Sequence, residues 1–183
     1  MSKRVLVAYA SEFGSTADVA ETIGYVLRQA GAEVEVQPVV AVSDLGGYDA
    51  AIVGSAIYNG QWLPEASYFV QFHADALSRM PVAYFVVCMT VRDDTDENRR
   101  AARSFLDPVL AATPQVQPVG IGLFAGSIET DKLPIEVRVR MWLTTKLRHG
   151  DYRNWQLIRA WALEMFTALT GQPAPESLLT AES

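Results

Sequence analysis

The sequence predicts an α/β fold, a doubly wound parallel sheet of five strands with helices on both faces. Three observations indicate it. Continuous apolar runs recur along the chain, stretches of helical periodicity separate them, and a turn with glycine and hydroxyl side chains joins the first run to the first helix. Strands that are buried on both faces give continuous apolar runs, whereas half-exposed strands alternate.

The first three elements are expected to be a strand, a helix and a strand. The apolar run Val5–Ala10 predicts the first strand. Thr16–Ala30 repeats apolar residues at helical spacing and precedes Gly31, a residue type that commonly ends helices. The second strand is expected at Glu33–Val39.

The next two strands are expected at Ala50–Gly54 and Val82–Met89, both rich in uninterrupted apolar residues. Between them, Pro64–Ser78 is predicted to be a helix with proline in its first turn, where the missing N–H is not needed.

The last elements are a helix at Glu97–Ala112 after an acidic loop, a strand at Val119–Phe124, and a helix at Tyr152–Thr170 that stops before Gly171. Strands that alternate with helices favour a parallel sheet. In such a sheet the ligand lies beyond the carboxyl ends of the strands, at a switch point between strands that wind in opposite directions.

Length and composition indicate one globular domain, residues 1–171, followed by a flexible tail at residues 172–183. The 183 residues are 50% hydrophobic, which is enough for a full core. No apolar run is long enough to cross a bilayer and no signal-peptide core follows the N-terminus, so a cytoplasmic protein is expected. The single cysteine, Cys88, allows no internal disulfide and agrees with a reducing compartment.

Several function classes find little support. The net charge of −6, from 15 basic and 21 acidic residues, argues against nucleic-acid binding. His73, His149 and Cys88 have no metal-ligand spacing, so no metal site is predicted. No serine lies in a nucleophile-elbow pattern, which disfavours a hydrolase.

The most informative segment is the turn after the first strand, Ser11-Glu12-Phe13-Gly14-Ser15-Thr16. Short hydroxyl side chains, a glycine and the free N–H groups of a helix start coincide there, which predicts a phosphate-binding loop. The three-glycine dinucleotide pattern and the P-loop lysine are both absent, so a single terminal phosphate is the expected ligand. The alternative is that the hydroxyls only cap the helix.

Two further strand ends carry candidate binding residues. The third strand is followed by small residues and two aromatic side chains, Tyr58 and Trp62, either of which could stack on a planar ring. The fourth is followed by the polar segment Thr90–Thr95. The alternative for the aromatic pair is ordinary packing, and Cys88 is most simply a small buried side chain.

The turn and the order of elements resemble the flavodoxins, whose phosphate loop has the form Ser/Thr-x-Thr-Gly-x-Thr. Ser11, Gly14 and Thr16 match this pattern, whereas Phe13 replaces a hydroxyl residue. The resemblance implies a sheet of order 2-1-3-4-5 that binds FMN. The residues that it assigns to the phosphate are Ser11, Glu12, Phe13, Gly14, Ser15 and Thr16, and those that it assigns to the ring are Ser55, Ala56, Ile57, Tyr58, Asn59, Gly60, Trp62, Thr90, Val91, Arg92 and Asp93.

Arg92 departs from what the flavodoxin resemblance leads one to expect. One-electron flavodoxins typically surround the ring with acidic groups, and an arginine there would instead favour two-electron reduction. The alternative is that Arg92 is a solvated partner of Asp93, Asp94 or Asp96.

An insertion at residues 126–150, expected to be partly helical, separates the last strand from the last helix. Within it, residues 135–148 combine apolar positions at helical spacing with four basic residues. Such a segment suggests peripheral contact with a membrane or an acidic partner. The alternative is that its apolar face packs onto the domain.

The insertion, with the segments Met80–Phe85 and Gly150–Trp155, resembles the menaquinone-dependent protoporphyrinogen IX dehydrogenase group of flavodoxin-like enzymes. This resemblance implies an FMN-dependent two-electron oxidoreductase that passes electrons to a quinone at the inner face of the membrane. It identifies no catalytic residue.

Two other functions stay open: an electron carrier that docks a redox partner protein, and a cofactor-free binding or regulatory module on the same fold. No sequence feature predicts an oligomeric state.

Overall fold

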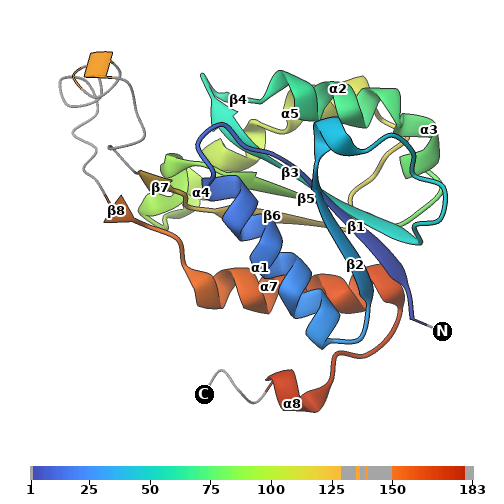
Figure 1. Ribbon diagram of the computed structural model, residues 1–183. Helices are drawn as coiled ribbons and strands as arrows, with labels where there is room; N and C mark the ends of the chain where they lie inside the picture. Colours follow the sequence, from blue (N-terminus) through green and yellow to red (C-terminus); the bar gives the residue numbers. More distant parts are fainter. Residues whose placement is uncertain (1, 129–134, 137–138, 140–149, 180–183) are drawn as a thin grey trace.

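The computed structural model describes residues 2–128, 135–136, 139 and 150–179. Its main sheet has five parallel strands in the order β2-β1-β3-β5-β6 (Figure 1). The short strand β4 pairs antiparallel with the end of β3. The predicted order 2-1-3-4-5 is therefore confirmed for the parallel strands. Their bounds are β1 Arg4–Ala10, β2 Glu33–Pro38, β3 Ala50–Tyr58, β4 Gln61–Trp62, β5 Val82–Val87 and β6 Gly120–Phe124.

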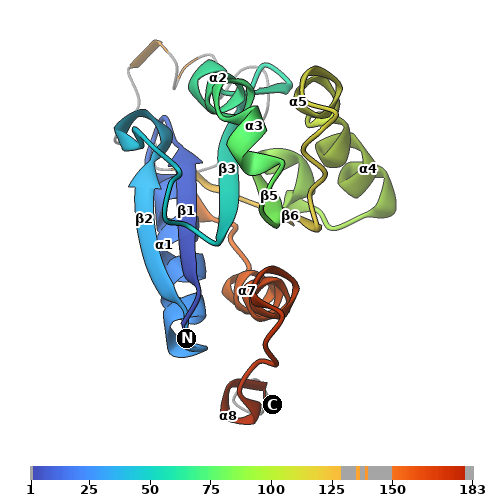
Figure 2. The same cartoon turned by 90° about the vertical axis from the view of Figure 1, so that its right-hand side faces the viewer.

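Helices cover both faces of the sheet (Figures 1 and 2). The helices α1 (Ser15–Gln29) and α7 (Trp155–Thr170) lie on one face and share a core with it. The opposite face is covered by α2 (Pro64–Phe72), α3 (Ala74–Leu77), α4 (Asp96–Ser104) and α5 (Asp107–Ala112), with two short 3₁₀ turns, η1 (Val39–Ala41) and η2 (Met89–Arg92). This two-sided cover is the predicted doubly wound arrangement.

The central strand β5 is completely buried, as its unbroken apolar sequence predicts. Tyr84 belongs to the core under α2–α5, and Phe85 belongs to the core under α1 and α7. Gly54 makes room for Phe85, because a Cβ at Gly54 would lie 2.0 Å from that ring. The side chains of neighbouring strands thus fit together only with a glycine at this position.

Two predicted helices are each divided into two. The segment 64–78 breaks at His73, whose backbone (φ −97°, ψ 13°) departs from helical geometry. The segment 97–112 breaks between Ser104 and Asp107, before Pro108, which cannot continue a helix because it lacks an N–H donor. The last helix begins at Trp155, later than predicted, because the Asn154 side chain caps it by accepting the Leu157 N–H at 3.0 Å.

The C-terminal segment contains a short helix in its described part, and the flexibility of residues 172–183 stays a prediction. The short helix α8 (Glu176–Leu179) forms there, and Ala174 and Leu178 pack against the core beneath α1 and α7. These apolar side chains, within a Pro-rich and polar segment, bring residues 174–178 into contact with the domain.

The insertion begins and ends as an antiparallel pair, β7 (Ser127–Ile128) and β8 (Gly150–Asp151). We call this pair the β7–β8 hairpin. Most of the predicted amphipathic segment 135–148 lies outside the described residues. Ile135, Glu136 and Val139 are described, and they are helical and exposed. Among the helices of the described ranges, none is long and apolar enough to cross a membrane.

The side chains of the edge strand β2 make polar contacts with β1 and with the segment before β3. The Glu35 carboxylate accepts hydrogen bonds from Arg4 Nη2 (2.8 Å), Gln37 Nε2 (2.8 Å) and the Tyr48 hydroxyl. These bonds hold the pKa of Glu35 below its usual value, whereas burial and the Glu35 carboxylate raise the pKa of Tyr48 to about 12.

Candidate functional site

Three loops meet at the carboxyl edge of the sheet, where the sequence predicts a ligand. They follow β1, β3 and β5, which are neighbours: Ala10 pairs with Ser55, and Ala56 pairs with Val87. The start of α1, β4 and the β7–β8 hairpin gather at the same edge (Figure 1). The predicted site segments 11–16, 55–62 and 90–93 are therefore brought together from distant parts of the chain.

The loop after β1 leaves the start of α1 without a side-chain cap. Its N-cap residue, Gly14, has a left-handed backbone (φ +93°), which favours glycine. The Gly14 N–H donates to Ser11 Oγ at 3.0 Å, and a Cβ at position 14 would meet no atom within 4 Å. The first N–H groups of a helix have no partner inside it, and here no side chain caps them, which leaves them available to a phosphate.

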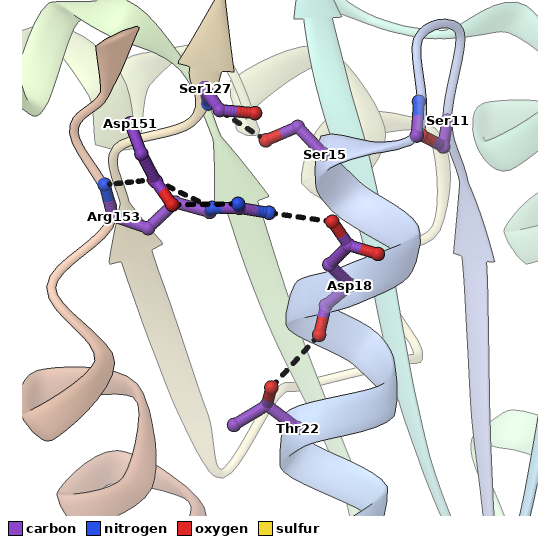
Figure 3. Close-up of polar contacts among 8 residues, drawn as sticks. Ser11, Ser15, Asp18, Thr22, Ser127, Asp151 and Arg153 are labelled. Carbon is purple, nitrogen blue, oxygen red and sulfur yellow. Dashed lines mark hydrogen bonds and ion pairs between the residues drawn. The ribbon is translucent and has the colours of Figure 1, made fainter.

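The uncapped helix start argues against the alternative that the hydroxyls only cap α1. Ser11 orders the loop, and Ser15 contacts the insertion, because its Oγ accepts the Ser127 N–H at 2.9 Å (Figure 3). Both hydroxyls keep their own proton for a further acceptor. Thr16 is buried, and Glu12 and Phe13 are exposed at the loop surface.

A tight hairpin forms the second part of the site. Ile57 pairs with Trp62 and Tyr58 with Gln61, and the two turn residues Asn59 (φ 51°) and Gly60 (φ 75°) both have positive φ. Two positive-φ residues are typical of the type I′ turn, for which Asn-Gly is the preferred sequence. The Asn-Gly pair was therefore the sequence signal for a hairpin that the sequence analysis missed.

The Ser55 hydroxyl fastens this hairpin. It is buried, accepts the Leu63 N–H at 3.0 Å and donates to the Ala56 carbonyl at 2.7 Å. These bonds fix the backbone of residues 55–63, so any contact of Ser55 with a ring would come from its backbone. Beyond it Ala56 and Ile57 are half-buried, and Tyr58, Asn59 and Gly60 are exposed.

The two aromatic residues of the hairpin occupy different environments. Tyr58 is 50% exposed, whereas Trp62 is 3% exposed and packs edge to face on Tyr84, with ring centroids 5.4 Å apart. Trp62 is therefore a packing residue, as the alternative reading of the aromatic pair expects. Its indole Nε1 is buried without a hydrogen-bond partner in the described part of the chain. Stacking on a planar ring stays a prediction for Tyr58.

The third part of the site is η2 and the residue after it. Thr90 is half-buried, Val91 is buried, and Arg92 and Asp93 are exposed. Arg92 Nη2 lies 2.8 Å from Asp93 Oδ2, and the guanidinium carbon lies 5.8 Å from the centre of the Tyr152 ring. Arg92 holds the pKa of Asp93 below its usual value. The pair carries no net charge, which agrees with the alternative that Arg92 is a solvated ion-pair partner of a neighbouring aspartate.

Nearby Cys88 is buried, and burial raises the pKa of its thiol. This is the environment of a packed side chain. A thiol in it is protonated at neutral pH and unreactive.

The structure adds a cluster that the sequence analysis missed, at the junction of α1 and the β7–β8 hairpin (Figure 3). Arg153 bonds Asp151 through Nε and Nη2, each at 2.7 Å, and bonds Asp18 through Nη1 at 2.7 Å. Its guanidinium carbon lies 4.5 Å from the centre of the Trp155 ring. Asp18 and Arg153 are 135 residues apart, and no local pattern in the sequence predicts their contact.

A pocket of about 310 Å³ lies beside the β3–β4 hairpin. Its walls come from β4, α2 and the α4–α5 junction, and they include Trp62, Tyr68, Phe105 and the amides of Gln61 and Gln71. Its volume is at the lower end of the range for small-molecule pockets. No group of three or more His, Cys, Asp or Glu side chains that could hold a metal ion is found within the described ranges.

A family model described as "Flavodoxin domain" matches residues 6–154. Among curated proteins, protoporphyrinogen IX dehydrogenase [quinone] from Escherichia coli (strain K12) is 24% identical, covering 93% of this chain and 98% of that protein. The protein of the same name from Leishmania major is 28% identical, covering 92% of this chain and 76% of that protein.

Solved structures show the same fold. A flavodoxin from the domain Archaea has a TM-score of 0.55 at 16% identity, covering 91% of this chain and 99% of that chain. Oxidised Flavodoxin 2 from Bacillus cereus has a TM-score of 0.54 at 20% identity, covering 90% of this chain and 97% of that chain.

Proposed function

Because this chain belongs to the flavodoxin domain family, we propose that it is an FMN-dependent oxidoreductase that passes two electrons from an organic donor to a quinone. Family membership implies FMN as the cofactor and redox chemistry as the function. The name shared by the Escherichia coli and Leishmania major relatives supports protoporphyrinogen IX as the donor and a quinone as the acceptor. The bound FMN would supply the electron-accepting ring.

One observation carries the cofactor assignment, namely the uncapped start of α1 at the carboxyl edge of the sheet. The lack of a side-chain cap leaves the first N–H groups of α1 available, and such groups suit a phosphate dianion. Ser11 and Ser15 would add hydroxyl donors from the two sides of the loop, and the backbone of Glu12 and Phe13 would close it. Phe13 offers no hydroxyl, so its contribution is limited to its N–H.

At the ring end, the chain would hold FMN between the β3–β4 hairpin and η2. Tyr58 presents an exposed aromatic face at the hairpin, and the small side chains at positions 56 and 60 let a ring approach the backbone. Arg92 and Asp93 would set the local charge near zero. Acidic groups, which typically surround the ring in one-electron flavodoxins, oppose negative charge on the reduced ring. A neutral surrounding would oppose this charge less.

An enzyme, unlike a simple carrier, needs room for a substrate beside the ring. The pocket next to the hairpin supports the enzyme, because its aromatic walls and amide groups suit a flat ring with carbonyl oxygens. The exposed apolar residues Ile135 and Val139 support contact of the insertion with a membrane or partner protein. We place the protein in the cytoplasm, at the inner face of the membrane.

The test starts with the absorption spectrum of the purified protein and release of any bound flavin. FMN is expected, and reduction under anaerobic conditions should proceed in one two-electron step. The reduced protein should then be reoxidised by menaquinone, and protoporphyrinogen IX should reduce the oxidised protein. Reduction in two one-electron steps without either substrate reaction would favour the electron carrier. A colourless protein that takes up no added FMN would favour the cofactor-free module.

A further inference from the structure

The strongest unassigned feature is the position of Arg153 between two carboxylates. Its side chain is only 10% exposed, although it is charged. The flat edge of the guanidinium bonds both oxygens of Asp151, and its remaining nitrogen reaches Asp18 (Figure 3). One face lies against Trp155. Such a bidentate and stacked arrangement is specific to arginine, because lysine has a single charged nitrogen.

Asp18 is the carboxylate whose position matters for the cofactor. It lies in the first turn of α1, three residues after Ser15, where a negative side chain normally stabilises the helix. The side chain is 61% exposed and bonds Arg153 at 2.7 Å. A phosphate dianion at the same helix end would be repelled by this carboxylate unless a positive charge offsets it.

The charges around the helix start are dominated by carboxylates. Asp18 and Asp151 together carry two negative charges and Arg153 carries one positive charge, which leaves the cluster at −1. Removing the arginine would leave −2 beside a loop that already contains Glu12. The bonds to Asp151 raise the pKa of Arg153, so the arginine stays charged at every physiological pH.

The same cluster fastens the insertion to the phosphate loop. Asp151 ends β8, and the Ser127 N–H of β7 donates to Ser15 Oγ at 2.9 Å. The Tyr152 N–H closes the junction by donating to the Gly126 carbonyl at 3.2 Å. The strand β7 therefore contacts the first turn of α1 directly, and β8 is linked to that turn through Arg153, which bonds both Asp151 and Asp18.

We propose that Arg153 is a positioning residue for the cofactor phosphate, because it holds the Asp18 carboxylate in an ion pair and offsets its charge beside the loop. This inference rests on the proposed function, since it needs FMN at the start of α1. It assigns a role to the short segment between β8 and α7, as the element that supplies this arginine.

The experiment compares FMN with riboflavin, which has the same ring and lacks the phosphate. Dissociation constants are measured by flavin fluorescence with the apoprotein of the full chain, for wild type, Arg153→Ala, Asp18→Asn and the double variant. Arg153→Ala should weaken FMN about tenfold, the effect of one unopposed charge at short range. Riboflavin affinity should change by less than about twofold. The double variant should recover most of the lost FMN affinity.

Arg159→Ala is the matched control, because it removes one positive charge from an exposed position of α7. It should leave both affinities unchanged. Thermal melts of each variant show whether the fold persists, and the comparison between the two flavins stays valid for a variant that is less stable.

Three results would overturn the proposal. Equal weakening of FMN and riboflavin binding by Arg153→Ala would mean a purely structural role for Arg153. The same conclusion would follow if adding Asp18→Asn to the Arg153→Ala variant failed to restore FMN affinity. Unchanged FMN affinity in Arg153→Ala would show that the ion pair is irrelevant to the cofactor. A wild-type protein that binds FMN no more tightly than riboflavin would instead contradict the phosphate site itself, and with it the proposed function.

Discussion

Replacing Gly14 by alanine tests the phosphate loop most directly, because an equivalent control exists at the other end of the same helix. Gly14 (φ +93°) and Gly31 (φ +107°) flank α1, and a Cβ at either position would meet no atom within 4 Å. Left-handed backbone costs an L-residue about 1–2 kcal/mol. Each alanine variant should therefore lower the free energy of unfolding by about 1 kcal/mol, or the melting temperature by about 2–4 °C.

The two variants should differ in cofactor binding. At Gly14 the new methyl group would lie in the loop where the phosphate is proposed to bind, so FMN affinity should fall about tenfold, which corresponds to about 1.4 kcal/mol. At Gly31 it would lie at the far end of the helix, and FMN affinity should stay within about twofold of wild type. Urea unfolding and fluorescence titration with FMN provide the two measurements.

Equal FMN affinity in the Gly14→Ala and Gly31→Ala variants, with equal losses of stability, would refute the reasoning. It would mean that the loop at Gly14 is not where the phosphate binds. A stability loss for Gly31→Ala alone would show that the backbone at the start of α1 relaxes without strain.

Three further predictions concern the hairpin, the edge strand and the ring. Ser55→Ala should lower the free energy of unfolding by about 1–3 kcal/mol, because it leaves a buried backbone N–H without an acceptor; urea unfolding giving a loss below about 0.5 kcal/mol would contradict this. The pKa of Tyr48 is raised from 10 to about 12 in the folded state, so its contribution to stability should be complete below pH 10 and lost as the pH rises through about 12. Tyr48→Phe loses the bond to Glu35, so the difference in the free energy of unfolding between wild type and this variant should shrink as the pH rises from 10 to about 12. A difference that does not change with pH would show that ionisation of Tyr48 is not its source. Arg92→Ala should leave the Asp93 carboxylate unpaired and lower the midpoint potential of bound FMN by about 30 mV, measured by equilibration with reference dyes. Asp93→Asn should raise this potential. Shifts of the same sign in the two variants would rule out a charge effect.

The strands of the sheet could be predicted because buried parallel strands have a continuous apolar sequence, whereas their order followed from the resemblance to the flavodoxins. The run 82–87 is completely buried in the structure. The breaks in the helical segments 64–78 and 97–112 were missed. Pro108 signalled the second break, whereas nothing local in the sequence signalled the first, at His73.

The candidate site was predicted as a set of loops, and the contacts within it were not. The register of neighbouring strands brings residues 10, 55 and 86 side by side, as a doubly wound sheet requires. The roles of the individual side chains depend on tertiary contacts. Ser55 fastens a hairpin, Trp62 lies in the core, and Arg153 meets Asp18 across 135 residues.

The polar residues of the edge strand β2 affect whether this strand can pair with a strand of a second copy of the protein. An open strand edge is a template for another strand, and charged side chains and proline are the usual protection against such pairing. Here Glu33 and Glu35 alternate along β2 and Pro38 ends it. A second copy aligned along this edge would bring carboxylates together and find no N–H at the proline. These features of β2 disfavour the growth of continuous sheets from this edge.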